Sequence, residues 1–335
     1  MIGRIGKKML FWIIVLVVFP LLATNLFIYK QQKRVLKEHI YHSLIHFTHT
    51  VESQILSTLY LKKERVKDFS TDGFIRLNLE AINSQPGNIG HRERLNNHLT
   101  KNKLQLDNDI ADISVYNKKG ELIASTNDGR LRKSLSNPEY YYHQARGVDV
   151  RIAEGNNHQR KIIISAPVSD NRGYGINGLI VIRFKADLLK NILHHSLELI
   201  HDPQVDQGNF IYEEQIYIVD TDKTIIVSNR PELIGKYMDK EIVSDGFSAD
   251  KKIIGEFTDI FDSKRIGAAL HIHTPELLLI TSFSKSEVFA PLYRMILWIT
   301  LFTLTGIILV IILAILLTRK ITRPIMNIAR ITEQI

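Results

Sequence analysis

The stretch ISVYNKKGELIAST, residues 113–126, decides the fold of this chain, because alternating apolar and polar residues flank a short polar turn on both sides. This is the pattern of a β-hairpin. Its near-copy IYIVDTDKTIIVSN, residues 216–229, repeats the pattern position by position in the second half of the chain. We therefore interpret the two stretches as the first hairpins of two copies of one module, a duplication at the level of the fold.

Further strand signals follow each hairpin. Runs rich in β-branched residues predict strands at 161–168 and 178–184 after the first hairpin, and at 252–257, 265–272 and 277–283 after the second. Helical patterns lie between these strands, at 138–147 and 186–200.

The region before the first hairpin predicts helices. Residues 30–69 carry one apolar stripe at spacings of three and four, formed by Ile40, Leu44, Phe47, Val51, Ile55 and Leu59. A helix of this length is a rod of ~60 Å that continues the first apolar run described below. The turn-rich segment 84–90 interrupts the helical pattern, which resumes at 91–107.

Two long apolar runs, 9–29 and 295–317, enclose most of the chain and contain no formally charged side chain. Each is long enough to cross the ~30 Å hydrocarbon layer of a bilayer as a helix. The alternative for residues 1–29 is a cleaved signal peptide, which would have a shorter apolar core and a small-residue cleavage site. Two spans place residues 30–294 on one side of the membrane and both tails on the other.

Basic residues predict the orientation, because short cytoplasmic segments are enriched in Lys and Arg. They flank both runs on the tail side, as Arg4, Lys7, Lys8, Arg319, Lys320 and Arg323. The formal net charge of +8 falls largely on the tails, so the region between the runs is nearly balanced, with 36 basic and 34 acidic residues. This distribution does not indicate a nucleic-acid partner. The absence of cysteine excludes disulfides and thiolate metal sites.

The expected fold class is α+β: a long N-terminal helix with two stacked PAS-like modules, flanked by two transmembrane helices and a short juxtamembrane helix. The expected segments are a cytoplasmic tail (1–8), a first membrane helix (9–29), a stalk helix (30–69), a membrane-distal module (70–195), a membrane-proximal module (196–290), a second membrane helix (295–317) and a relay helix (318–335).

This order of segments resembles the double Cache (dCache) sensor domain found outside the cytoplasm in bacterial histidine kinases, chemoreceptors and diguanylate cyclases. The resemblance covers roughly residues 30–290 and depends on the combined order of the motifs rather than on any one of them. The matching segments are VYNKKGELIAST (115–126), LSNPEYYYHQARG (135–147), APVSDNRGYGINGLIVIRF (166–184) and IYIVDTDKTIIVSNRPELIGK (216–236).

The C-terminal segment TRKITRPIMNIARITEQI, residues 318–335, resembles the opening helix of a HAMP signal-relay domain, in which Pro324 is the family's proline after the membrane. Ile325 and Ile328 continue an apolar seam with the spacing of a coiled coil. The alternative is an ordinary amphipathic juxtamembrane helix.

The resemblance also implies candidate ligand-binding residues. In members that bind amino acids, an Arg on the pocket helix holds the ligand carboxylate and an Asp on the closing strand holds the amine. The corresponding residues here are Glu139 and Arg183, so both charges are reversed. We therefore expect a small anionic or hydroxylated ligand held by Arg183, with Tyr141 or Tyr142 stacking on it or hydrogen-bonding to it.

An equally weighted alternative is a structural Glu139–Arg183 pair that lines an empty or differently shaped pocket. Tyr116 and Ser165 are further candidates for the pocket wall, although each also fits a plain strand position.

Four histidines, His39, His42, His46 and His49, lie within one arc of the long helix, opposite its apolar stripe. They are weak candidates for a metal site across a dimer, because four helical histidines spread along the axis cannot all reach one ion. A solvated polar face is the favoured interpretation.

No P-loop, HExxH, GxSxG or GGDEF motif occurs, so no catalytic residue and no cofactor are expected within the chain. The sequence indicates the ligand-sensing and relay portion of a homodimeric receptor in the bacterial inner membrane, and we expect a histidine kinase. The alternatives are a diguanylate cyclase, a chemoreceptor, a membrane subunit without its own output, and a membrane-tethered hydrolase.

Overall fold

The computed structural model describes residues 4–85, 89–127, 147–154, 160–170, 175–185, 187–200, 214–248 and 252–317. The chain divides into two compact units. One unit comprises residues 44–284, and the other is formed by the two ends of the chain, residues 1–43 and 285–335.

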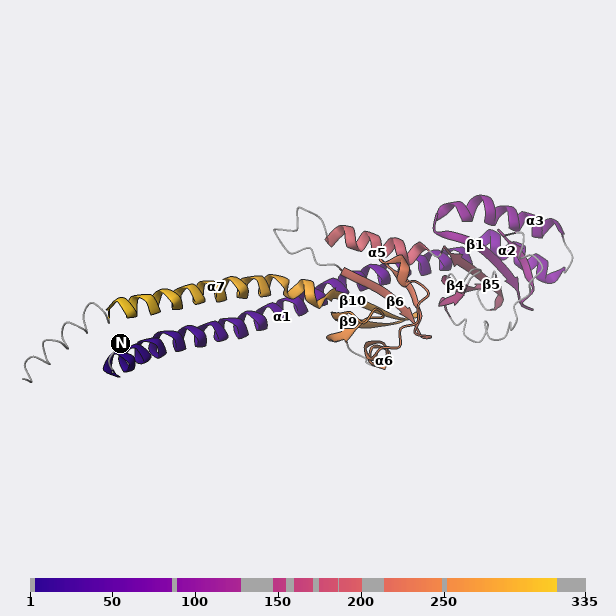
Figure 1. Ribbon diagram of the computed structural model, residues 1–335. Coiled ribbons are helices and arrows are strands. Elements are labelled where there is room, and N and C mark those ends of the chain that lie inside the picture. The colour runs from indigo at the N-terminus through magenta and orange to yellow at the C-terminus, as the bar shows by residue number, and fades with distance from the viewer. Residues whose placement is uncertain are drawn as a thin grey trace, which may run out of the picture. The chain divides into compact units, whose positions relative to one another are not determined.

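The unit of residues 44–284 contains two antiparallel sheets of the same topology (Figure 1). The distal sheet has the order β2-β1-β5-β4-β3, with strands β1 (Ile110–Asn117), β2 (Leu122–Ser125), β3 (Asp149–Glu154), β4 (Arg160–Ser169) and β5 (Ile176–Phe184). The proximal sheet has the order β7-β6-β10-β9-β8, with strands β6 (Glu214–Asp220), β7 (Ile225–Ser228), β8 (Ile253–Thr258), β9 (Lys264–His273) and β10 (Glu276–Ser284).

The two first hairpins are equivalent down to single hydrogen bonds. Asn117 Oδ1 accepts from the backbone N–H groups of Lys119 and Glu121, both at 2.9 Å. In the second hairpin, Asp220 Oδ1 accepts from the N–H groups of Asp222 and Thr224, at 3.1 and 2.9 Å. Both hairpins also carry a register irregularity at the same step. The predicted duplication is therefore confirmed.

Helices connect and cover the sheets. Those in the described residues are α1 (Arg4–Thr71), α2 (Gly73–Ser84), α3 (Ile89–His98), α5 (Asp187–Ile200), α6 (Glu241–Ser248) and α7 (Lys285–Leu317). A π-helical turn (Leu99–Lys103) and a 3-10 turn (Leu104–Leu106) lead into β1, and a 3-10 turn (Pro231–Leu233) follows β7. The sequence patterns did not predict β3 or α6. The predicted helix at 138–147 lies outside the described residues.

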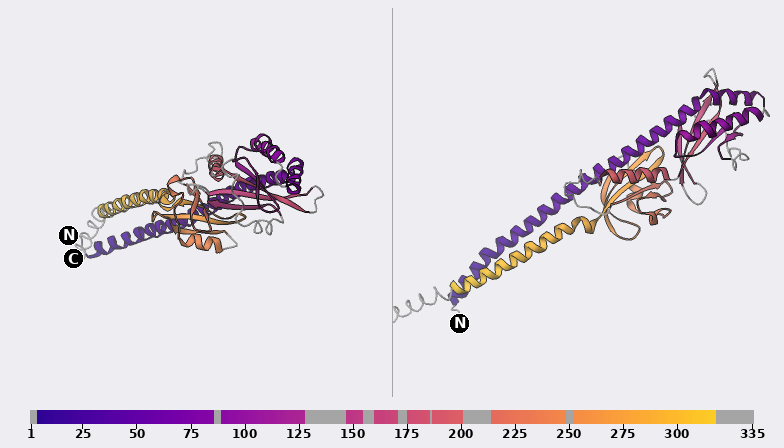
Figure 2. Two further views of the ribbon diagram at one scale, coloured as in Figure 1. Left: turned by 90° about the vertical axis from the view of Figure 1, so that its right-hand side faces the viewer. Right: turned by 90° about the horizontal axis from the view of Figure 1, so that it is seen from above.

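The apolar stripe of α1 is buried, as predicted, with Leu44, Val51 and Ile55 fully covered. One continuous apolar core lies along this helix and takes side chains from one face of each sheet, from Ile113 in β1 to Leu279 in β10. The views in Figure 2 show α1 passing along both sheets. Because burial of apolar area is the main stabilising term, this shared core makes α1 the common support of both modules.

The other unit pairs the start of α1 with α7. Each of these helices contains a stretch long and apolar enough to cross a membrane, and large apolar side chains such as Phe19, Leu26, Leu301 and Phe302 are exposed along them. Helix α1 continues through Pro20 without a break. Asn25 Nδ2 donates a hydrogen bond to Thr303 Oγ1 at 2.7 Å, so a polar contact joins the two helices.

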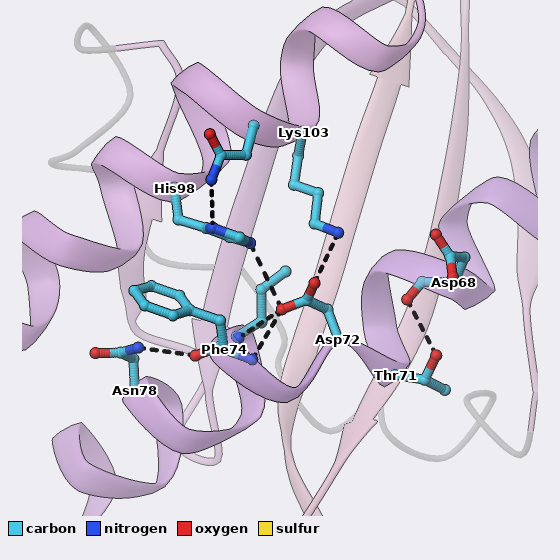
Figure 3. Close-up of polar contacts among 9 residues, drawn as sticks. Asp68, Thr71, Asp72, Phe74, Asn78, His98 and Lys103 are labelled. Carbon is cyan, nitrogen blue, oxygen red and sulfur yellow. Dashed lines mark hydrogen bonds and ion pairs between the residues drawn. The ribbon is translucent and has the colours of Figure 1, made fainter.

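A single residue, Asp72, separates α1 from α2 and caps the second helix (Figure 3). Its Oδ1 accepts from the backbone N–H groups of Phe74 and Ile75, at 2.9 and 3.0 Å, and its Oδ2 lies 2.7 Å from Lys103 Nζ. His98 Nε2 lies 3.5 Å from Oδ1. This cluster determines how the chain turns at the end of α1, since the cap fixes where α2 begins.

Burial alone raises the pKa of the Asp72 carboxyl, but hydrogen bonds from Lys103 and the Ile75 backbone, together with the charges of Lys103 and His98, lower it below its usual value. A carboxylate with a lowered pKa stabilises the fold fully above its unfolded value, and this stabilisation is lost as the pH falls through the folded value. We therefore expect the stability advantage of the wild type over Asp72→Asn to be constant above about pH 5 and to shrink at lower pH.

Thermal unfolding of the chain in detergent micelles, followed by circular dichroism between pH 2.5 and 7, checks this expectation. Asp68→Asn is the control, because Asp68 is exposed one turn earlier. A difference between wild type and Asp72→Asn that stays constant down to pH 2.5 would contradict it.

Candidate functional site

Polar side chains occupy the face of the distal sheet that points away from the shared core. Ile113 and Val115 of β1 belong to that core, so the alternating residues Asp112, Ser114 and Tyr116 lie on the opposite face. All three are nevertheless buried, with exposed fractions of 3%, 0% and 4%. A strand buried on both faces with polar residues on one of them indicates an internal polar site rather than a solvent-exposed surface.

Arg183 of β5 joins this row, because the strand register places it directly opposite Asp112. Its Nη1 lies 2.7 Å from Asp112 Oδ1 and 3.3 Å from Ser114 Oγ. Burial alone lowers the pKa of the Arg183 guanidinium, but the charge of Asp112 and the Tyr116 hydroxyl raise it above its usual value. The guanidinium therefore stays charged, and its planar group of donors remains suited to an anionic or hydroxylated partner.

The same face extends across the neighbouring strands. Ser165 of β4 lies opposite Val181 of β5, and Asp149 of β3 lies opposite Ser165. Asp149 Oδ2 accepts from Arg151 Nε at 2.6 Å. An apolar patch lies between these polar groups and consists of Tyr116, Leu122, Ile163, Leu179 and Val181. The face thus combines apolar surface with a few charged groups, which is the composition of small-molecule sites.

The equivalent face of the proximal sheet is filled. Counting from the matched turns, Gln215, Tyr217 and Ser282 replace Asp112, Ser114 and Arg183. Tyr217 packs with Leu233 and Met238 and leaves no room for a water molecule. Burial raises the pKa of Tyr217 to about 12, despite its hydrogen bond to Ser282 and the charge of Arg265. The sheet carrying Arg183 is therefore the better candidate for a ligand.

Of the predicted site residues, Arg183 and Tyr116 lie together, and Ser165 lies on the same face. Tyr141, Tyr142 and Glu139 lie outside the described residues. One of the two interpretations of the sequence paired Arg183 with Glu139, and neither included Asp112, which is the carboxylate that contacts Arg183 in the described part of the chain.

The alternating pattern D-I-S-V-Y at 112–116 was the available signal for this polar row. It shows a polar face, but it does not show which residue of another strand lies opposite.

The histidine row is exposed along α1, at His39, His42, His46 and His49. His49 Nδ1 contacts Glu52 Oε2 at 2.8 Å, and His39 Nδ1 contacts Ser43 Oγ at 3.4 Å. Among the described residues, no group of three or more His, Cys, Asp or Glu side chains could hold a metal ion. The relay candidates Pro324, Ile325 and Ile328 lie outside the described residues.

Comparison with known families identifies the class of this protein. A family model, dCache_1, described as a Cache domain, matches residues 28–292. The chain therefore belongs to the double Cache family, as the motif order predicted. A search of curated proteins finds no match.

Solved structures agree on the fold. The sensor domain of the V. cholerae histidine kinase DctB has a TM-score of 0.54 and 16% sequence identity, over 76% of this chain and 99% of that domain. The ligand-binding domain of the Campylobacter jejuni chemoreceptor Tlp3, in complex with L-norvaline, has a TM-score of 0.52 and 12% identity, over 76% of this chain and 94% of that domain. These likenesses show that the chain shares the fold of these two domains.

Proposed function

We propose that the chain is the extracytoplasmic ligand-sensing and transmembrane relay portion of a bacterial receptor in the inner membrane. Residues 30–294 lie outside the cytoplasm, with a distal module at 70–195 and a proximal module at 196–290. The family membership, the two apolar helices and the basic residues beside them support this topology.

The observation that carries the proposal is the buried Asp112–Arg183 pair on the distal sheet, at a place where Gln215, Tyr217 and Ser282 fill the equivalent face of the proximal sheet. Charged groups are rarely buried unless they are paired or used. The ligand is small and anionic or hydroxylated, and it engages the donors of Arg183 that Asp112 leaves free. Tyr116 and Ser165 line the site, together with Tyr141, Tyr142 and Glu139.

An α-amino acid is a second candidate ligand, because Asp112 and Arg183 together offer one group for an amine and one for a carboxylate. The reversed charges at Glu139 and Arg183 therefore argue less strongly against an amino acid, because Asp112 supplies a carboxylate beside Arg183. The Tlp3 sensory domain, a neighbour in fold, has been solved with isoleucine bound.

In this proposal the receptor is a homodimeric sensor histidine kinase, with relay through Pro324, Ile325 and Ile328 into a HAMP-like helix. The fold of the DctB sensor domain supports a histidine kinase, and that of Tlp3 supports the alternative of a chemoreceptor. The coding sequence after Ile335 distinguishes these outputs from a diguanylate cyclase or a subunit without its own output.

Isothermal titration of the chain in lipid nanodiscs, against dicarboxylates, polyols and α-amino acids, tests the proposal. We expect one class to bind with one site per chain and to raise the melting temperature. Failure of every class to bind a chain that is folded by circular dichroism would contradict a ligand-sensing role for this face.

A further inference from the structure

A polar cleft of about 610 Å³ lies where the two modules meet. Strands β3 and β4 of the distal module line one side, and the turns β6–β7 and β9–β10 of the proximal module line the other. Arg160, the first residue of β4, crosses this cleft. Its Nη2 lies 3.0 Å from Asp220 Oδ2 and 3.3 Å from Asp222 Oδ2.

Comparison of the two equivalent hairpin turns shows which oxygen of the Asp220 carboxylate the β6–β7 turn requires. Asp220 Oδ1 holds the β6–β7 turn by accepting two backbone N–H groups. Asn117 Oδ1 holds the equivalent β1–β2 turn with the same two bonds, so one neutral amide oxygen suffices. The negative charge of Asp220 is therefore not needed for the turn, and its second oxygen faces Arg160.

Burial makes this second oxygen energetically important. The Asp220 side chain is only 8% exposed and that of Arg160 is 23% exposed, whereas Asp222 is 70% exposed. A buried carboxylate without a partner is costly, so the chain favours arrangements that keep β4 against the β6–β7 turn. The contact with the exposed Asp222 contributes little.

Strand β4 also connects Arg160 to the candidate ligand face. Ile163, three residues after Arg160, lies directly opposite Arg183 in the register of β4 with β5. A displacement of β5 at Arg183 therefore acts on the strand whose first residue holds the proximal module.

We propose that Arg160 and Asp220 form an inter-module tie that holds the two modules in one arrangement and passes movement of the distal sheet to the proximal module. The second part of this proposal rests on the proposed function, because it takes the ligand to bind at Arg183. The first part concerns the protein without any ligand.

Because the chain contains no cysteine, spin labels can be placed at will. Double electron–electron resonance between Lys118→Cys and Asp245→Cys, both exposed positions, measures the distance between the modules in the full chain in nanodiscs. Asp220→Asn keeps the turn, as Asn117 does in the distal hairpin, and removes only the charge. Arg160→Gln removes the other partner, and Asp222→Asn is the matched control in the same turn.

We expect a single narrow distance peak in the wild type and in Asp222→Asn, and loss of that peak through broadening and a shifted mean in Asp220→Asn and Arg160→Gln. The double variant should broaden no further than either single variant, because both remove one interaction. Distributions of Asp220→Asn and Arg160→Gln that superimpose on that of the wild type would overturn the tie.

This test is independent of ligand binding. An unchanged distance distribution together with a bound ligand from the panel refutes the tie alone. A changed distribution with no bound ligand supports the tie as a structural element and refutes the proposed function instead.

Discussion

Replacing Lys62 with methionine is expected to lower the free energy of unfolding of the sensor modules by roughly 3–5 kcal/mol, the usual cost of leaving buried charges unpaired. Lys62 Nζ, on α1, lies 2.7 Å from both Asp107 Oδ2 and Asp109 Oδ2. The two aspartates directly precede β1. The Lys62 and Asp107 side chains are only 12% and 9% exposed. Without the ammonium group, the buried Asp107 carboxylate loses its partner and faces the Asp109 carboxylate, which is 36% exposed.

The matched control is Lys67→Met on the same helix. Lys67 contacts Glu64 at 3.6 Å, but both side chains are about half exposed or more, at 60% and 48%. Exposed pairs of this kind contribute about 0–1 kcal/mol. Urea unfolding of both variants in micelles, followed by circular dichroism, compares them directly. Equal losses of unfolding free energy in the two variants would show that burial does not determine the energy of the contacts of Lys62 with Asp107 and Asp109.

Replacing Arg183 with methionine is expected to remove ligand binding and also to destabilise the distal module by roughly 3–5 kcal/mol, because Asp112 is then buried without its partner. The Asp112 and Arg183 side chains are 4% and 13% exposed. The stability loss alone would lower apparent binding, so Arg183→Met cannot separate the two roles. The exposed Lys185→Met, two residues further along the chain, is the control for removing a positive charge.

The double variant Asp112→Leu with Arg183→Met separates them. Apolar replacement of both members of a buried pair is often close to neutral, so we expect stability to recover to within about 1 kcal/mol of the wild type. Binding of the compound selected by the titration panel should remain lost. A stable double variant that binds this compound like the wild type would remove Arg183 and Asp112 from the site.

Much of the fold was predictable because its signals are local. The apolar stripe of the long helix, the alternation within each hairpin and the two apolar runs all depend on residues close together in the chain. The stripe residues Leu44, Val51 and Ile55 are buried as expected. The duplication was visible because equivalent turns require equivalent side chains, Asn117 in one and Asp220 in the other.

Two elements escaped prediction for identifiable reasons. Strand β3 lies at the edge of its sheet, and its apolar residues Val150 and Ile152 alternate over only six residues between charged ones. Helix α6 is eight residues long and contains Gly246, a poor helix former. Its position is set by packing of Ile242 and Val243 on the proximal sheet, which no local pattern reveals.

By itself, the sequence determined the order of most elements, the repeat, the two apolar helices long enough to span a membrane and the presence of a polar row on the first strand, since each depends on spacing along the chain. Only the tertiary structure decided the partners of the charged residues. Asp112 meets Arg183 through strand register, Lys62 meets Asp107 through packing of a helix on a sheet, and Arg160 meets Asp220 across two modules. Such pairs join residues distant in the chain, and their energy depends on burial, which exists only once both sheets have packed on α1.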